Sequence, residues 1–458
     1  MPEKAISRIW AEWVHGLKFE DLDDETIYHA KRILYDAMGC ALGGHRAEDC
    51  EISLAVIEHM GGNPEATLIA TGFETNAYMA SLANALMVRV MDFNDIYWKE
   101  DPSHPSDIIP AALAVGERQG KSGKDLILGV VIGHELEMRL CEFFKPGIRE
   151  RGWHHASLTQ LVSPLVAGKM LDLDPDQMTN AVGISGCHNF SLGAVAAGKL
   201  TMMKNTVDPM ATQSGVMAAL LAQKGYIGTE LIFEGKEGVC QQMGEGFDYN
   251  ELTEGLGDSF KIRECYYKAF PTEFLTQSPV TAALKLVKEK DIDWKDVTGV
   301  KVHTIARAVD ILADPSKYRP TSKETADHSM PYCVGAAIMD RMITPLQFKP
   351  EKISNPELLA LIQKIEVVAD KKLEEEFPVM QPSVVDIKVK SGEEFSQRVD
   401  YAKGDPREPM TDDDLRDKFY GLTAEFMKDD QRNKIHEMIF NMENVPTIKE
   451  FMKAMIVK

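Results

Sequence analysis

The first 270 or so residues of the chain carry apolar side chains at helical spacing. In the segment 23–43, the apolar residues fall on one helical face and a glycine pair supplies the end. Ser122 with Asp125, and Asp174 with Gln177, match the spacing of the capping box that opens helices. This part of the chain is therefore predicted to form a helix bundle.

The pattern changes after about residue 275. A helical stretch is followed by residues 300–304, in which apolar and polar side chains alternate with the period of a strand. A second alternating run at 385–389 turns at Ser391-Gly392 into a third at 395–401, which predicts a β-hairpin. A capping box at Thr411 then marks a helix start, and apolar residues recur at helical spacing from there to the last residues.

These patterns predict a mainly α protein with two domains. The larger domain is all-helical and comprises residues 1–272 plus 402–458. The smaller domain, residues 273–401, is α+β and is inserted into the larger one.

Composition and charge narrow the class of protein. The chain has 458 residues, 44% hydrophobic and 27% charged, and its 51 Lys and Arg against 71 Asp and Glu leave a formal charge of −20. Such a charge disfavours nucleic acid and anionic membranes as partners. The seven cysteines never have CxxC spacing, so neither a disulfide framework, a zinc ribbon nor an iron–sulfur cluster is predicted. With no long apolar run and no secretory pattern, we expect a soluble cytoplasmic protein.

Two partial motifs lack a required element. The segment 116–122 resembles a phosphate loop, but only three residues separate its glycines where four are needed. His134-Glu135 begins like a zinc-protease motif, yet Met138 stands where the second histidine would be. Nicotinamide-binding, nucleophile-elbow and kinase motifs are also missing, which disfavours dehydrogenases, serine hydrolases and kinases.

A loop dense in titratable groups carries the first candidate chemistry. Asp92, Asp95 and His104 lie on either side of the turn-prone Asp101-Pro102. Such a loop can perform acid–base work. Alternatively, it is a solvated loop whose aspartates cap the helix that begins near Pro110.

Two polar turns lie before apolar helices. The first contains His154, which can be exposed while His155 or Ser157 caps the helix. The second is Asp327-His328-Ser329, for which an N-terminal cap is the default interpretation. Neither turn is decisive alone.

Two lysines leave a similar choice open. Lys204 precedes a helix predicted over 211–223, and on composition it is a surface lysine. Lys268 lies among aromatic residues, where its amine is either partly desolvated or extends past the rings to water.

Taken together, these segments resemble the MmgE/PrpD family, which contains 2-methylcitrate dehydratase, cis-aconitate decarboxylase and an iminodisuccinate epimerase. The resemblance covers nearly the whole chain and rests on six ordered motifs: MDFND with SHPSD at 91–107, GWH at 152–154, the lysine and glycine pattern from Lys204 to Gly215, KAFPTEF at 268–274, DHSMPY at 327–332 and YAKGDPREP at 401–409. It implies a large helical domain with a smaller α+β lid, usually as a homodimer. It also implies that no metal or organic cofactor is used.

The resemblance places six residues in a pocket between the domains: Asp92, His104, His154, Lys204, Lys268 and Tyr332. Lys204 and Lys268 would bind substrate carboxylates and stabilise enolate-like charge. His104, oriented by Asp92, would transfer the proton at carbon, and Tyr332 or His154 would help a hydroxyl leave as water.

The activity implied is that of a cofactor-independent lyase, foremost a hydro-lyase acting on a hydroxy di- or tricarboxylate such as 2-methylcitrate. The alternatives are a cis-aconitate-type decarboxylase, a dicarboxylate epimerase and an inactive polycarboxylate-binding homologue. Two positions depart from the family pattern: Ile96 stands where a threonine is common, and Leu275 replaces a histidine usual in the dehydratases. Loss of a hydrogen-bonding group can change substrate discrimination by orders of magnitude.

Overall fold

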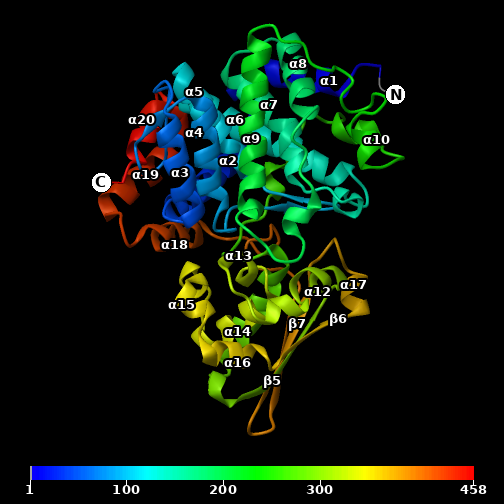
Figure 1. Cartoon of the computed structure of the whole chain (residues 1–458), viewed down its shortest axis with the longest axis vertical. Coiled ribbons are helices and arrows are strands. Elements are labelled where there is room, and N and C mark those ends of the chain that lie inside the picture. Colours follow the sequence, from blue (N-terminus) through cyan, green and yellow to red (C-terminus); the bar gives the residue numbers. More distant parts are fainter. Residues whose placement is uncertain (1–2, 458) are drawn as a thin grey trace.

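The computed structural model describes residues 3–457 and shows a larger helical body above a smaller mixed body (Figure 1). Helices hold 58% of the residues and strands 10%, which confirms the mainly α prediction. None of the helices in the described part of the chain combines the length and apolar character that crossing a bilayer requires.

The larger body contains helices from both halves of the sequence. They are α1 (Ile6–Gly16), α2 (Asp24–Gly44), α3 (Glu48–Met60), α4 (Ala77–Arg89), α5 (Ile109–Gln119), α6 (Gly123–Phe143), α7 (Ala156–Met170), α8 (Pro175–Gly186), α9 (Met203–Gln223), α10 (Val239–Met243), α18 (Asp412–Thr423), α19 (Asp429–Phe440) and α20 (Ile448–Ala454). Two ribbons of two strands each interrupt them: β1 (Ala66–Thr67) with β2 (Glu74–Thr75), and β3 (Tyr97–Trp98) with β4 (Pro102–Ser103).

The C-terminal helices, orange to red in Figure 1, lie beside the N-terminal ones: α18 and α19 pack on α2, and α20 packs on α5 and β1. This placement is the one expected if the smaller body is an insertion. The limits 272/273 and 401/402 stay a prediction.

The capping boxes predicted from sequence open the helices as expected. Ser122 accepts a hydrogen bond from the backbone N–H of Asp125 at the start of α6, and Asp174 does the same for Gln177 at the start of α8. Thr411 likewise caps α18. Each cap satisfies N–H groups that the first helical turn leaves unpaired.

The smaller body is built around a four-stranded sheet in the order β6-β5-β7-β8. Its elements are α11 (Gln277–Glu289), β5 (Val297–Thr304), α12 (Ala306–Leu312), α13 (Lys323–Ala326), α14 (Met330–Asp340), α15 (Pro350–Ile353), α16 (Pro356–Ile362), β6 (Ile365–Ala369), α17 (Lys371–Glu374), β7 (Ser383–Val389) and β8 (Glu394–Val399). The predicted strand at 300–304 lies within β5, and the predicted hairpin is β7 with β8, joined through Gly392 at a φ of +90°. The buried Val302, Val385 and Ile387 form the core face of the sheet, against which α11 packs.

The prediction for α9 was wrong at its start. The helix begins at Met203, eight residues before the predicted start, and continues through Pro209. Close packing on α7 holds it in place: a Cβ on Gly215 would lie 2.0 Å from Oγ of Ser163, so only glycine permits this approach. The earlier start puts Lys204 in the first turn of α9 rather than in a loop.

Candidate active site

A cavity of about 80 Å³ lies where the loop 92–107, the first turn of α9, the segment 268–274 and His328 meet. Its lining combines cationic, acidic and imidazole groups with apolar side chains: Arg89, Arg149, Lys204, Lys268, Asp92, Asp101, Glu273, His104, His154, His155, His328, Ile96, Trp98, Trp153, Phe274 and Ile311, among others. Five of the six residues predicted for the pocket are therefore brought together.

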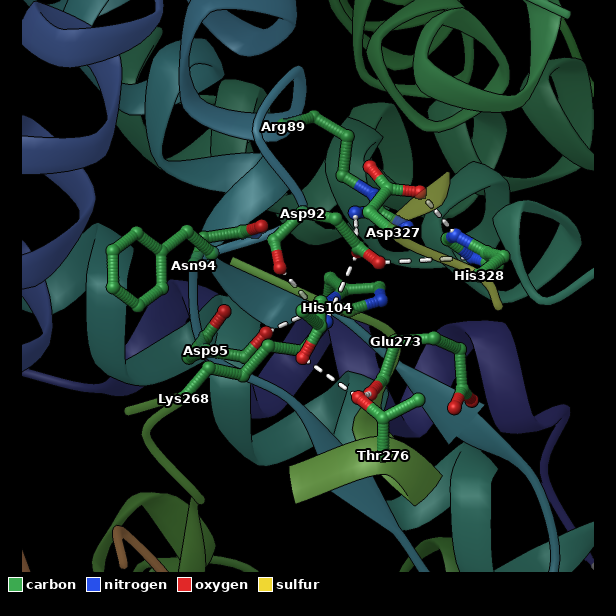
Figure 2. Close-up of polar contacts among 12 residues, drawn as sticks. Arg89, Asp92, Asn94, Asp95, His104, Lys268, Glu273, Thr276, Asp327 and His328 are labelled. Atoms are coloured by element: carbon green, nitrogen blue, oxygen red, sulfur yellow. Dashed lines mark hydrogen bonds and ion pairs between the residues drawn. The ribbon is translucent and has the colours of Figure 1, made fainter. Parts of the chain in front are cut away.

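Asp92 is the centre of the charged part of the site. It follows the end of α4 with a left-handed φ of +50°, a conformation that aspartate tolerates better than most residues. Its buried carboxylate lies 3.0 Å from Nζ of Lys268 and 3.2 Å from Nζ of Lys204, and it also accepts a hydrogen bond from Arg89. His328 Nε2 lies 3.7 Å away. Figure 2 shows the carboxylate between Arg89, Lys268 and His328.

This clustering shifts the ionisation of the acid and the lysines. Burial alone would raise the pKa of Asp92, but the charges of Lys204, Lys268 and Arg89 hold it well below its ordinary value. Burial, with the nearby Arg89, lowers the pKa of Lys204 to about 8, and burial lowers the pKa of Lys268 as well. A carboxylate permanently charged at neutral pH thus neutralises only part of the surrounding positive charge.

His104 is held by a backbone carbonyl. Its Nδ1 lies 2.6 Å from the carbonyl oxygen of Asp95, which can only accept, so Nδ1 carries the proton and Nε2 keeps a free lone pair. Burial, with the positive charges of Arg89 and Lys268, holds the pKa of His104 well below its usual range. The expectation that Asp92 orients His104 was wrong, because the Asp92 carboxylate is already engaged with the lysines and arginine.

Asp95 in turn fixes the loop that carries His104. Its carboxylate accepts hydrogen bonds from Nε2 of His134 at 2.8 Å and from the backbone N–H of Ser106 at 3.2 Å. Cys265 Sγ lies 3.4 Å from the same carboxylate. His134 therefore belongs to this buried hydrogen-bond network.

The rings of His154 and His155 lie against each other at the start of α7, with centroids 3.9 Å apart and planes tilted by 36°. His154 Nδ1 accepts a hydrogen bond from the backbone N–H of Ala156, and burial together with the charge of His155 holds the pKa of His154 well below its ordinary value. His155 Nε2 lies 3.5 Å from Oδ1 of Asp208, which α9 presents. His155, the N-cap residue of α7, does not cap the helix with its side chain.

His328 and Arg89 belong to the site although neither was among the predicted site residues. His328 Nδ1 lies 2.6 Å from Oδ1 of Asp327, and burial together with Lys204 lowers the pKa of His328 to about 4. Its motif was noted in the sequence but interpreted as a helix cap, a role that Ser329 alone fills for α14. Arg89 lies in no recognisable motif, and only its burial among three aspartates marks it.

Tyr332 does not line the cavity, which corrects the prediction. Its hydroxyl donates a 2.5 Å hydrogen bond to the backbone carbonyl of Gln347, and its ring packs on Phe348. Tyr332 lies four residues beyond His328, in the first turn of α14, where the helix is surrounded by the core of the smaller body.

The remaining lining is largely apolar, with two weak acids and one arginine. Burial raises the pKa of Asp101 to about 6 and that of Glu273 to about 7. Arg149 is half-buried and has no ion pair within residues 3–457. Ile96 lines the cavity, whereas the other unusual position, Leu275, is buried and is not part of the lining.

Two groups of side chains have atoms close enough to hold a metal ion. The first is Asp95, His134 and Cys265, and the second is His154, His155 and Asp208. The first group is already satisfied by its own hydrogen bonds. In the second, neither oxygen of the fully buried Asp208 has a hydrogen bond of good geometry within the described residues.

Comparison with known families and proteins identifies relatives of the whole chain. Residues 8–252 match the MmgE/PrpD N-terminal domain, and residues 270–444 match the MmgE/PrpD C-terminal domain. The chain is 24% identical to the cis-aconitate decarboxylase-like protein oryM of Aspergillus oryzae, over 98% of this chain and 97% of that protein. It is 24% identical to human cis-aconitate decarboxylase over 96% and 92% of the two chains. The mitochondrial 2-methylcitrate dehydratase of Yarrowia lipolytica is 25% identical over 82% of this chain and 74% of its own.

Proposed function

Because the chain belongs to the MmgE/PrpD family, we propose that it is a hydro-lyase that removes water from a hydroxy di- or tricarboxylate such as 2-methylcitrate. The observation that carries the proposal is the placement of an uncharged His104, with Nε2 free, in one cavity with Lys204 and Lys268. Dehydration next to a carboxylate needs a base for the carbon-bound proton and cations for the charge that develops on that carboxylate.

The lysines have the geometry to hold a substrate carboxylate. Their amines share the Asp92 carboxylate at 3.0 and 3.2 Å, so a second anion in the cavity would find donors already fixed in place. As His104 Nε2 takes the proton from the adjacent carbon, negative charge moves onto this carboxylate, and the lysines stabilise it more strongly than they stabilise the ground state. His154 contributes a hydrogen bond from Nε2, because its Nδ1 is the acceptor for Ala156.

Charge distribution supports a polyanionic substrate. The whole chain carries −20, yet the cavity gathers Arg89, Lys204, Lys268 and Arg149 against one strongly acidic group, Asp92. A local excess of positive charge inside an acidic protein selects small anions that reach the cavity and disfavours large ones that contact the whole surface. Arg149, with no acidic partner in the described part of the chain, is positioned for a second carboxylate.

A second candidate is decarboxylation of cis-aconitate or a similar acid. The observation in its favour is that the named cis-aconitate decarboxylases match 96–98% of this chain, whereas the named dehydratases match 72–82%. The same lysines would hold the substrate, but carbon dioxide rather than a proton would leave the reacting carbon.

One experiment separates the two reactions. The purified protein is first treated with a chelator to remove metal ions. It is then incubated with 2-methylcitrate, citrate and cis-aconitate, and the products are followed by NMR together with released carbon dioxide. A new unsaturated acid without gas supports dehydration, and gas from cis-aconitate supports decarboxylation instead. Consumption of none of the three acids, or equal turnover by Lys204→Met, would contradict both. The implied homodimer is tested separately by sedimentation equilibrium.

A further inference from the structure

We propose that His155, held by Asp208, is the acid of this site: it protonates the hydroxyl that leaves the substrate. The inference rests on the dehydration proposed above and supplies the proton that this reaction requires. Neither residue was among the predicted site residues, and the acid role expected for Tyr332 is ruled out by its position outside the cavity.

Two histidines that line the cavity contact different groups, one a neutral carbonyl and the other a carboxylate. His104 and His155 lie with ring centroids 5.3 Å apart, and both line the cavity. A neutral carbonyl holds His104, whereas a carboxylate lies 3.5 Å from His155. A carboxylate stabilises an imidazolium more strongly than a neutral carbonyl does, so the geometry suits His104 to the role of base and His155 to the role of acid.

The Asp208 carboxylate has few other partners. It is fully buried on α9, and Arg89 approaches only to 3.8 Å while also serving Asp92 and Asp107. Burial alone would raise the pKa of Asp208, but His155, His154 and Arg89 hold it below its ordinary value. A buried anion with both oxygens short of hydrogen bonds is costly unless a neighbouring group carries a proton to it, and His155 is the group within reach.

The other groups around His155 add negative charge to this part of the cavity. Facing its ring are two acids and two imidazoles: Asp208, Asp101, His104 and His154, with Arg89 beyond Asp208. The pKa of Asp101 is about 6, so at pH 7 it adds negative charge, while the lowered pKa values leave both imidazoles neutral.

The proton balance closes with these two residues. His104 Nε2 takes the proton of the carbon next to the bound carboxylate, and the electron pair of that C–H bond moves onto the carboxylate before it forms the double bond. The C–O bond breaks, its electron pair leaves with the oxygen, and His155 gives that oxygen a proton, so that water departs. His155 ends neutral and His104 protonated, and exchange with solvent restores both.

The first test needs no substrate. Nitrogen-15 NMR of histidine-labelled protein at pH 7, with His155 assigned by His155→Asn, should show His155 doubly protonated in the wild type and neutral in Asp208→Asn. Asp107→Asn is the matched control, because it removes another buried acid beside Arg89, at 3.4 Å, without touching His155. A neutral His155 in the wild type overturns the acid role whatever the activity.

The second test separates the acid from the base. In deuterated water, His155→Asn should lose about 10²–10⁴-fold in turnover yet still exchange the substrate proton, whereas His104→Gln should lose both. In Asp208→Asn the fall of kcat/KM at high pH should begin at lower pH, because loss of the carboxylate makes the imidazolium easier to deprotonate. In Asp107→Asn that fall should stay at the wild-type pH.

The failures are distinguishable. A wild type that neither consumes nor exchanges any of the acids overturns the proposed dehydration. Equal loss of exchange and turnover in His155→Asn overturns the acid role alone. Loss of activity on chelation, restored by zinc, would overturn it too, since His154, His155 and Asp208 would then be metal ligands.

Discussion

Replacing Asp92 by asparagine should destabilise the protein strongly, because it removes the one carboxylate that two buried lysines share. Lys268 and Lys204 lie 3.0 and 3.2 Å from its oxygens. At an effective dielectric constant of about 20, each attraction is worth about 5 kcal/mol before desolvation is subtracted. Breaking a buried pair by removing one partner costs about 3–5 kcal/mol net. The neutral amide of the variant would also leave Arg89 and both lysines repelling one another.

This cost converts to a measurable melting shift. Unfolding entropies of about 2.1 cal/mol/K per residue give about 1 kcal/mol/K for 458 residues unfolding as one unit, so Asp92→Asn should melt about 3–5 °C below the wild type at pH 7. The deficit should shrink toward pH 9.5. Without the Asp92 carboxylate, the pKa of Lys204, already lowered to about 8 in the wild type, falls further, so the folded variant releases this proton at a lower pH than the folded wild type. Because the unfolded lysine still holds its proton there, the stability of the variant begins to rise with pH before that of the wild type does.

Differential scanning calorimetry at pH 7 and 9.5 measures both effects, with Asp107→Asn as control. Burial, opposed in part by Arg89, raises the pKa of Asp107 well above its usual value, so its negative charge contributes less to stability than that of Asp92, and asparagine should cost under about 1 kcal/mol. The reasoning is refuted if the two variants melt within about 1 °C of each other at pH 7, a difference worth about 1 kcal/mol on this scale. A deficit that grows at pH 9.5 would also refute it.

Three further predictions concern other residues. Ile96→Thr should raise kcat/KM for a substrate with a carboxylate near this wall, by about 10-fold for one added hydrogen bond, and competition assays between citrate and 2-methylcitrate would show it. Arg149→Gln should raise KM about 10-fold or more with little change in kcat, whereas Arg151→Gln, outside the cavity, should not. Burial raises the pKa of Glu137 to about 8, so the contribution of this carboxyl to stability is full below pH 4.5 and is lost as pH rises through 8. Between pH 6 and 9 the melting temperature of Glu137→Gln should therefore fall less than that of the wild type.

The regular elements could be predicted because their signals are local. Each signal depends only on residues that are close in the sequence, as in the capping boxes at Ser122, Asp174 and Thr411 and the alternating strands around Gly392. The start of α9 could not be found this way, because proline inside a helix is locally unfavourable and the packing of α9 on α4, α7 and α8 leaves no local signal in the sequence. β6 lacks clean alternation, since its pairing with β5 is parallel and only Ile365 is buried.

The candidate site divides along the same line. Residues in recognisable motifs, such as His104 and Lys268, were found through their resemblance to a family, but their partners were not. Asp208 lies 53 residues beyond His155 in the sequence and within an ordinary helix, and only the crossing of α7 and α9 brings the two together. Tyr332 was predicted for the site although it lies outside it. It shares a motif with His328, but its side chain points into the core of the smaller body.

The repulsion among the buried cations explains why the site needs the Asp92 carboxylate. Arg89, Lys204 and Lys268 could not remain charged together in a dry cavity, since burial already lowers the pKa values of both lysines. One shared carboxylate reduces this repulsion without cancelling it, which leaves the amines cationic, fixed and in excess. A substrate carboxylate that enters the cavity completes the neutralisation. The relief of the repulsion among the cations then adds to the free energy of substrate binding. Anions lacking a second carboxylate should consequently bind far more weakly, and isothermal titration of the catalytically impaired His104→Gln variant with mono-, di- and tricarboxylates should show affinity rising with each added carboxylate.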